Sequence, residues 1–205
     1  MQEKKWLDWL IRLQSLAQAG LAYGKDKYDI ERFEEIRDLS VQMLTALSDL
    51  PAQKVENLFA SETGYQTPKI DTRAAIFKEN KILLVQEANG TWALPGGWCD
   101  VDQSVKENTI KEVKEEAGLN VVLDKVIAVQ DRDKHNQPPY AYKICKIFSL
   151  CYATGGAFTK NLETIASDYF ERDQLPTLAQ AKTNEDQIQM CFAAYENDDW
   201  KTVID

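Results

Sequence analysis

The chain has 205 residues, 44% hydrophobic and 28% charged, with nine Gly and six Pro, so it is long enough for one domain plus an appendage. This composition excludes a disordered, collagen-like or low-complexity chain. The formal net charge of −9 disfavours sequence-independent binding to nucleic-acid backbones or anionic lipid, so an anionic ligand needs local cations or a metal ion.

The cysteines and the first residues indicate a cellular compartment. The four cysteines form no C-x-x-C pair and have no nearby His to complete a zinc site, and they are Cys99, Cys145, Cys151 and Cys191. We expect reduced thiols in a cytoplasmic protein. Asp8 and Arg12 interrupt the first apolar stretch, which argues against a signal peptide, and no segment approaches the ~20 apolar residues of a membrane span.

Apolar residues recur at helical spacing through the first sixty-odd positions, which predicts two or three helices. These positions are Trp6, Trp9, Leu10, Leu13, Leu16, Ala17, Phe33, Ile36, Met43 and Leu47. Gly20 and Gly24 are expected to end the first helix, Asp29 to cap the second, and Pro51 to end the second or open a third. Since so few helices bury little by themselves, residues 1–66 are predicted to be a helical arm that forms a homodimer, with a peptide-binding surface as the alternative.

Residues 67–205 are predicted to form a second domain, because the apolar period changes to that of strands after residue 66. Strands are expected at 70–77 and 82–85 around a short hairpin connection, and at 91–94. The following Leu94-Pro95-Gly96-Gly97-Trp98 cannot continue a strand, because Pro lacks an N–H donor and Gly permits an irregular backbone. A loop is therefore expected there.

A helix is expected to follow this loop, with Ser104 and Glu107 forming a capping box and Gly118 ending it. Further strands are expected at 121–130, 141–152 and 164–170, and a last helix at about 184–195 with Thr183 as a candidate cap. The second domain is therefore mixed, with sheet dominant.

Three carboxylates of the predicted helix, Glu112, Glu115 and Glu116, occur at i, i+3 and i+4, which places them on one side. Their mutual repulsion weakens the helix unless a cation compensates it. Carboxylate oxygens are the ligands that Mg²⁺ and Mn²⁺ prefer, commonly together with substrate phosphates. The alternative is a solvated acidic surface.

The segment from Gly97 to Leu119 resembles the Nudix hydrolase signature, G-x5-E-x7-R-E-U-x-E-E-x-G-U, where U is aliphatic. Seven of nine specified positions match over 23 residues: Gly97, Glu112, Val113, Glu115, Glu116, Gly118 and Leu119. Gln103 replaces the family's Glu and Lys111 its Arg, two residues that pair in the family. A Gln103–Lys111 hydrogen bond, or pairing of Lys111 with Glu107, is the expected substitute.

The resemblance covers about residues 67–195 and implies an α+β fold, a Nudix α/β/α sandwich around a mixed β-sheet, preceded here by the all-helical arm. It also implies hydrolysis of a nucleoside diphosphate linked to another group, with Mg²⁺ or Mn²⁺ held by the three signature carboxylates and the Gly96 carbonyl. Glu116 and Glu112 are expected as ligands, and Glu115 as ligand or base. Glu163 is a candidate base from another loop, or an ordinary surface residue.

Cations near the expected strand ends are candidates to bind an anionic substrate. They are Arg73 and the run Arg132, Lys134 and His135, which lies in a predicted loop before two prolines. Trp98 is a candidate to grip a base or a cationic head group. The alternatives are a solvated loop for His135 and sheet packing for Trp98.

Along its whole length the chain resembles two-domain bacterial Nudix proteins described as CDP-choline or ADP-ribose pyrophosphatases. This resemblance implies CDP-choline hydrolysis to CMP and phosphocholine first, and ADP-ribose hydrolysis second. Two alternatives from other classes are an enzyme that processes RNA ends, without an extended nucleic-acid surface, and a non-catalytic nucleotide sensor. The intact signature carboxylates favour an enzyme over a sensor.

Overall fold

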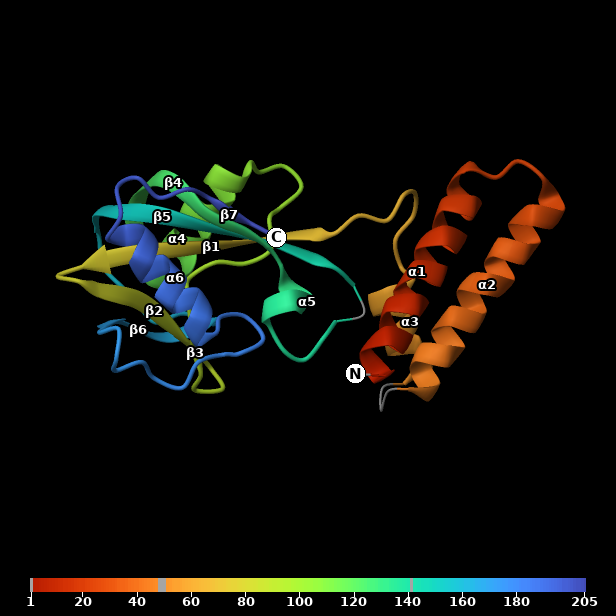
Figure 1. The fold of residues 1–205 in the computed structure, drawn as a ribbon, viewed down its shortest axis with the longest axis horizontal. Helices are drawn as coiled ribbons and strands as arrows, with labels where there is room; N and C mark the ends of the chain where they lie inside the picture. Colours follow the sequence, from red (N-terminus) through yellow and green to blue (C-terminus); the bar gives the residue numbers. More distant parts are fainter. Residues whose placement is uncertain (1, 48–50, 141) are drawn as a thin grey trace. The chain divides into compact units, whose positions relative to one another are not determined.

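The computed structural model describes residues 2–47, 51–140 and 142–205, which form six helices and seven strands (Figure 1). The chain divides into two compact units. One consists of Met1–Pro68 with Pro139–Lys143, and the other of Lys69–Pro138 with Ile144–Asp205. Among the described residues, no helix combines the length and apolarity needed to cross a membrane.

The first unit contains three helices, α1 (Gln2–Tyr23), α2 (Lys27–Ala46) and α3 (Ala52–Phe59). Its small core consists of Leu10, Val55 and Phe59, with Ile11, Val41 and Leu44 packed against it. The expected arrangement of helices is present, because apolar residues at i, i+3 and i+4 converge on this core.

The ends of α1 and α2 differ in detail from the sequence prediction. Gly20 lies inside α1, where a Cβ would collide with the Phe33 ring, so this glycine allows close packing of α1 on α2. The cap of α2 is Asp26, whose carboxylate accepts hydrogen bonds from the N–H groups of Tyr28 and Asp29. The prediction of Asp29 as the cap is therefore wrong, because Asp26 is the residue with extended backbone at the helix start.

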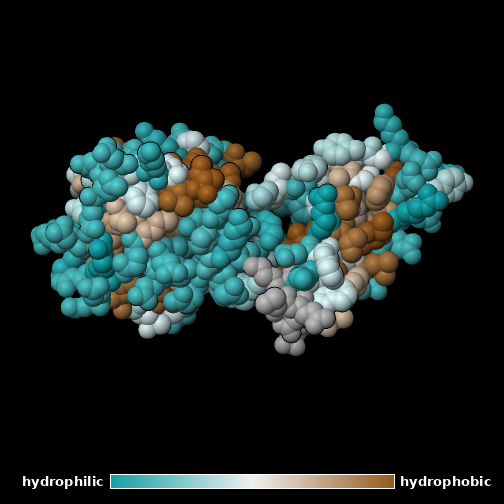
Figure 2. All heavy atoms as spheres, in the orientation of Figure 1, coloured by the Kyte–Doolittle hydropathy of each residue, from teal (hydrophilic) through white to brown (hydrophobic). Residues whose placement is uncertain are grey.

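The helical unit also exposes an apolar stripe of its own. Four large apolar residues of this unit are about half exposed. They are Trp9 (55%) and Leu16 (48%) of α1, Leu39 (49%) of α2 and Leu47 (60%), which follows α2. Figure 2 shows apolar atoms gathered along these helices. Several large apolar side chains exposed on two neighbouring helices are typical of an interaction site.

The second unit is built on a mixed sheet with strand order β3-β2-β1-β5-β4-β7, and β6 also pairs with β2. The pairs β1–β5 and β4–β7 are parallel, whereas β1–β2, β2–β3, β2–β6 and β4–β5 are antiparallel. The strands are β1 (Lys69–Lys78), β2 (Lys81–Glu87), β3 (Trp92–Ala93), β4 (Leu119–Asp131), β5 (Ile144–Gly156), β6 (Thr164–Phe170) and β7 (Val203–Ile204).

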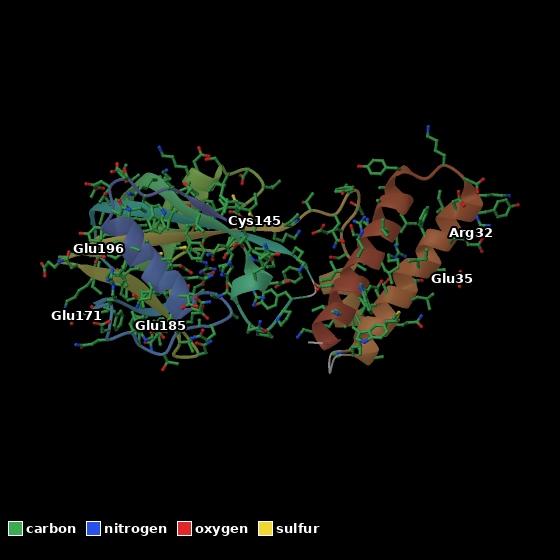
Figure 3. All side chains as sticks on the ribbon, in the orientation of Figure 1. Arg32, Glu35, Cys145, Glu171, Glu185 and Glu196 are labelled. Carbon is green, nitrogen blue, oxygen red and sulfur yellow. The ribbon has the colours of Figure 1, made fainter. Side chains whose placement is uncertain are left out.

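Two helices cover opposite faces of this sheet, α4 (Val105–Ala117) and α6 (Glu185–Tyr195). Successive residues of β1 point to opposite faces, so Ala74 packs in the cluster beneath α4 and Ala75 in the cluster beneath α6. Figure 1 shows α6 in front of the strands and α4 behind them, and Figure 3 marks Glu185 and Glu196 at the two ends of α6. The predicted α/β/α sandwich is confirmed.

The sequence predicted the caps of α4 correctly and the N-terminal cap of α6 incorrectly. Ser104 and Glu107 form the predicted capping box of α4, and Gly118 ends the helix with a left-handed φ of 70°. The Glu107 carboxylate accepts from the Ser104 N–H, not from Lys111. The cap of α6 is Asn184 instead of Thr183, because the Asn184 side chain accepts from the Gln187 N–H, whereas the Thr183 hydroxyl accepts from the Leu94 N–H.

Some elements were not predicted. The segment 132–135 forms a short helix, α5 (Arg132–His135), and β7 follows α6. The strand expected over 141–152 begins at Ile144, and Ala141 lies outside the described residues. The cysteines are free thiols, as expected, and Cys145 and Cys151 both lie on β5. Figure 3 marks Cys145.

Candidate active site

The carboxylates of α4 lie beside the face that packs on the sheet. Val113 and Ala117 are fully buried in the core cluster beneath this helix. This packing fixes the rotation of α4, so the Glu112 side chain is 12% exposed, whereas the Glu115 side chain is 54% exposed. Glu112 and Glu116 therefore point toward the preceding loop, and Glu115 lies nearer solvent.

The glycine loop before α4, Leu94–Trp98, contacts two of these carboxylates directly. The Gly96 N–H donates to a Glu116 carboxylate oxygen at 2.7 Å. Gly96 has a φ of +142°, and a Cβ there would collide with the Thr72 carbonyl oxygen. A Cβ on Gly97 would lie 2.8 Å from a Glu112 carboxylate oxygen. Only glycine therefore lets the loop run between β1 and the acidic side of α4.

Burial and mutual repulsion raise the pKa of two of the carboxylates, Glu112 and Glu116. Burial raises the pKa of Glu116 to about 7, against the lowering effects of Arg73 and the Gly96 N–H. Burial also raises the pKa of Glu112, with the charges of Glu115 and Glu163 adding to the rise. A bound cation would relieve both effects, because it favours the ionised form of each carboxyl.

Lys111 makes a different contact from the one expected at this position. Its ammonium pairs with Asp100 at 2.6 Å and lies 3.7 Å from one carboxylate oxygen each of Glu112 and Glu115. The prediction that Gln103 would bond Lys111 is therefore wrong, because the loop brings Asp100 to that ammonium. Sequence spacing gave no signal for Asp100, since it lies three residues before the position specified by the signature.

A second loop supports the end of α4 from the other side. The Asn161 side-chain N–H donates to the Glu115 carbonyl, and the Thr164 hydroxyl donates to the Glu116 carbonyl, both at 2.8 Å. Glu163 lies between these two residues in sequence, and its charge contributes to the raised pKa of Glu112. The structure therefore brings Glu163 into the electrostatic reach of the carboxylate helix, and its role as a base stays a prediction.

Arg73 lies inside a buried ion cluster that the sequence did not reveal. Its guanidinium makes two hydrogen bonds to Asp71, at 2.7 and 3.0 Å, and a third to the Leu94 carbonyl at 3.1 Å. The Lys146 ammonium contacts the same Asp71 carboxylate at 2.6 Å. Arg73 thus anchors the start of the glycine loop, and direct contact with a substrate phosphate stays a prediction that this placement does not favour.

The cluster shifts the titration of its members. Although burial opposes them, the Arg73 and Lys146 charges together hold the pKa of Asp71 at about 2. Burial and the neighbouring Arg73 charge lower the pKa of Lys146 to about 8. The available sequence signal was charged residues inside strands that are otherwise apolar, since Asp71 and Arg73 share one face of β1 and Lys146 is the partner of Asp71 on β5.

The other candidate substrate residues have varied surroundings. Arg132 is only 1% exposed and donates to the carbonyls of Pro138 and Ala181, so it supports its loop instead of lying at the surface. His135 pairs with the Asp205 carboxylate at 3.0 Å. Lys134, between them, is exposed. Their contact with substrate stays a prediction.

Trp98 lies at the end of the glycine loop. Its backbone forms a bridge to Asp71 of β1, and its side chain is 49% exposed. Trp98 is thus partly open to solvent, and its contact with a ligand stays a prediction.

The donor set of this site fits a hard divalent cation. Glu112, Glu115 and Glu116 supply carboxylate oxygens from one helix, and two of them carry the raised pKa values of crowded, desolvated anions. In the described residues no three acidic, His or Cys side chains already converge at ligand distance. Glu116, Glu112 and Glu115 would hold the ion, with substrate phosphates completing its coordination.

Comparisons with known proteins match both units of the chain. Residues 67–192 match the family model described as the NUDIX domain. Residues 4–59 match a model described as a UDP-X-like, N-terminal oligomerisation domain. The first match includes both the glycine loop and the carboxylate helix.

Two of three similar proteins cover nearly the whole chain. The Bacillus subtilis protein named "Putative ADP-ribose pyrophosphatase YjhB" is 41% identical over 204 residues, which cover 99% of this chain and 98% of that protein. A Streptococcus suis structure titled as an ADP-ribose pyrophosphatase is 52% identical, with a TM-score of 0.65, and covers 68% of this chain and 100% of its own. A structure of a UDP-X diphosphatase is 31% identical, with a TM-score of 0.64, and the match covers 99% of this chain and 100% of that one. The chain belongs to the Nudix hydrolases and is a two-domain pyrophosphatase of that family.

Proposed function

We propose that this enzyme hydrolyses ADP-ribose to AMP and ribose 5-phosphate with a divalent cation, Mg²⁺ or Mn²⁺, at Glu112, Glu115 and Glu116. The observation that carries the proposal is the glycine loop bound to Glu116, which holds two largely buried carboxylates side by side on α4. The similar proteins named as ADP-ribose pyrophosphatases favour this substrate over CDP-choline, which the sequence resemblance implied first.

The reaction adds one water to the diphosphate. A bond forms between the water oxygen and one phosphorus, and the bond from that phosphorus to the bridging oxygen breaks, so each product keeps one phosphate. A dication at the site supplies neutralisation of the diphosphate charge and polarises phosphorus. The protein itself orients the ligands through the Gly96 N–H and excludes water from the buried side of Glu116.

We assign the base to a carboxylate outside the inner pair. The Gly96 N–H binds Glu116 and Gly97 lies beside Glu112, so these two are the first ligand candidates, with Glu115 as ligand or base. Glu163 and Glu115 are more exposed, and the charge of each acts on Glu112, so either one can accept the proton that water loses. Glu163 is our first choice, because Glu115 lies close to the Lys111 ammonium.

CDP-choline is the second candidate substrate. The UDP-X diphosphatase structure matches the chain over its full length, which supports a pyrimidine nucleoside diphosphate as an acceptable ligand. The half-exposed Trp98, which follows Gly97 in the glycine loop, suits a quaternary ammonium group, because aromatic faces attract such cations.

The helical unit is proposed to form a homodimer. Its exposed apolar stripe, including Trp9 and Leu16, needs a covering surface, and the matching family model is described as an oligomerisation domain. A second copy supplies a self-complementary apolar stripe, which is the usual basis of a two-fold interface.

A substrate panel tests the proposed function. Purified protein with Mg²⁺ or Mn²⁺ is assayed against ADP-ribose, CDP-choline and a short RNA with a capped 5′ end, and the products are separated by chromatography. We expect AMP and ribose 5-phosphate, with the highest kcat/KM for ADP-ribose. Faster turnover of CDP-choline or of the RNA end would replace the substrate assignment, and binding without turnover would restore the sensor alternative.

A further inference from the structure

The Lys111 ammonium lies close to the carboxylates proposed to hold the dication. It is 3.7 Å from an oxygen of Glu112 and 3.7 Å from an oxygen of Glu115. A positive charge at this distance competes with any other cation for the same oxygens. An enzyme that needs a dication there must keep this ammonium from moving onto them.

Asp100 provides the competing contact for Lys111. Its carboxylate is 2.6 Å from the ammonium, closer than either glutamate oxygen at 3.7 Å. Both side chains are solvent accessible, at 54% for Asp100 and 35% for Lys111, so the pair adds little to the free energy of folding. The main effect of the Asp100–Lys111 pair is to determine where the Lys111 charge lies.

The fold fixes the position of Asp100. Its backbone N–H donates to the Asn108 side-chain oxygen at 3.2 Å, and the Asn108 side-chain N–H donates to the Thr72 hydroxyl at 2.9 Å. Asn108 is fully buried, so this chain of contacts ties the Asp100 backbone to β1 through the first turns of α4. The contact between Asp100 and Lys111 is thus built into the loop.

We propose that Asp100 is a positioning residue that keeps the Lys111 ammonium at 3.7 Å from the Glu112 and Glu115 oxygens and so prevents a closer approach to the dication site. This inference rests on the proposed metal-dependent function. Asp100 is not one of the proposed ligands, and in this proposal it acts through its contact with Lys111. Replacing Asp100 by a neutral residue frees the ammonium to move onto Glu112 and Glu115, which weakens binding of the dication.

The direct test is calorimetric titration of Mn²⁺ into the full chain at low ionic strength, without substrate. For Asp100→Asn we expect a dissociation constant about three- to tenfold higher than that of the wild type, the scale of one unit charge shifted by a few ångströms near solvent. Asp100→Glu keeps the carboxylate and is expected to stay within about twofold. Asp102→Asn removes the same charge from the same exposed loop and serves as the matched control.

The same substitutions in a Lys111→Gln chain show whether the change in Mn²⁺ affinity depends on Lys111. In a Lys111→Gln chain, Asp100→Asn is expected to change Mn²⁺ affinity no more than Asp102→Asn does. An effect that persists in this background, or equal effects of Asp100→Asn and Asp102→Asn in the wild-type background, would overturn the inference. A wild-type chain that binds no Mn²⁺ would instead overturn the proposed function itself, so the two failures are distinguishable.

Discussion

At the residue scale, the acidic side of α4 lowers the free energy of unfolding when it is ionised without a bound cation. Glu116 has a pKa of about 7 in the folded chain, above the ordinary value of 4.5. Between these values the folded state holds more protons than the unfolded state, so the free energy of unfolding falls as pH rises from about 4.5 through 7. Above pH 7 the whole penalty is present, and a bound dication offsets it.

The raised pKa of Glu116 predicts the effect of Glu116→Gln on the protein freed of metal with EDTA. At pH 8 the substitution should raise the free energy of unfolding by about 1–3 kcal/mol, because it removes a desolvated charge, and at pH 4.5 it should give no gain. Urea titrations at the two pH values measure this difference. Glu115→Gln, at a more exposed position of the same helix, is the control, and an equal gain at both pH values would contradict the assignment.

The buried cluster of Asp71, Arg73 and Lys146 predicts a large effect from one substitution. Asp71→Asn removes the carboxylate that contacts both buried cations, which should cost about 3–5 kcal/mol of stability. Glu171→Gln removes one partner of the exposed pair with Lys81 and should cost less than about 1 kcal/mol (Figure 3). Denaturant melts of the two variants compare them, and similar costs would show that the cluster does not hold the fold.

At the element scale, the glycine loop connects the sheet to the carboxylate helix. Gly96 combines a positive φ, a hydrogen bond to Glu116 and close approach to the Thr72 carbonyl. Arg73 and Thr183 bind the Leu94 backbone at the beginning of the same loop. The loop is therefore fixed from three elements, β1, α4 and the segment before α6.

Gly96→Ala should disrupt this loop more than a glycine substitution in open space. Its Cβ would collide with backbone, so we expect a stability loss above about 3 kcal/mol together with loss of most activity. Gly90 has a φ of +87° with no atom near its would-be Cβ, so Gly90→Ala should cost about 1 kcal/mol and retain activity. Thermal melts and kcat measurements on both variants decide whether the clash or the backbone conformation matters.

Local patterns predicted more of the elements than of their contacts. Strand alternation, the Ser104 capping box and the Gly118 end placed the sheet and α4, because these signals depend on neighbouring residues. The pairing of Asp100 with Lys111 could not be predicted in this way. It joins residues eleven positions apart through an irregular loop, whose path is set by buried contacts of Asn108.

At the scale of the whole molecule, the two units differ in how much of their apolar surface they bury. The hydrolase unit buries two apolar clusters on the two faces of its sheet, whereas the helical unit has a core of few residues and an exposed apolar stripe. This difference is why the sequence could predict an association surface without giving its geometry. The stripe is visible as helical periodicity, but its partner is another surface.

Leu16→Glu should separate the proposed homodimer. A charge in the middle of the apolar stripe is costly only if the stripe is buried between copies, since Leu16 is already 48% exposed in one chain. Sedimentation velocity should therefore show a shift from dimer to monomer, with helix content retained by circular dichroism. Glu35→Lys, an exposed charge reversal on α2, is the control (Figure 3). An unchanged sedimentation coefficient for Leu16→Glu would contradict the dimer.

The carboxylate side of α4 is, in our proposal, the catalytic metal site, and the whole assignment of function depends on it. The most direct measurement is the rate of ADP-ribose hydrolysis as free Mn²⁺ is raised from zero after EDTA treatment, for the wild type and for Glu116→Gln. We expect wild-type turnover that depends on Mn²⁺, and a loss of about a hundredfold or more in kcat/KM for the folded variant. Wild-type hydrolysis without a dication, or full activity in Glu116→Gln, would contradict this assignment.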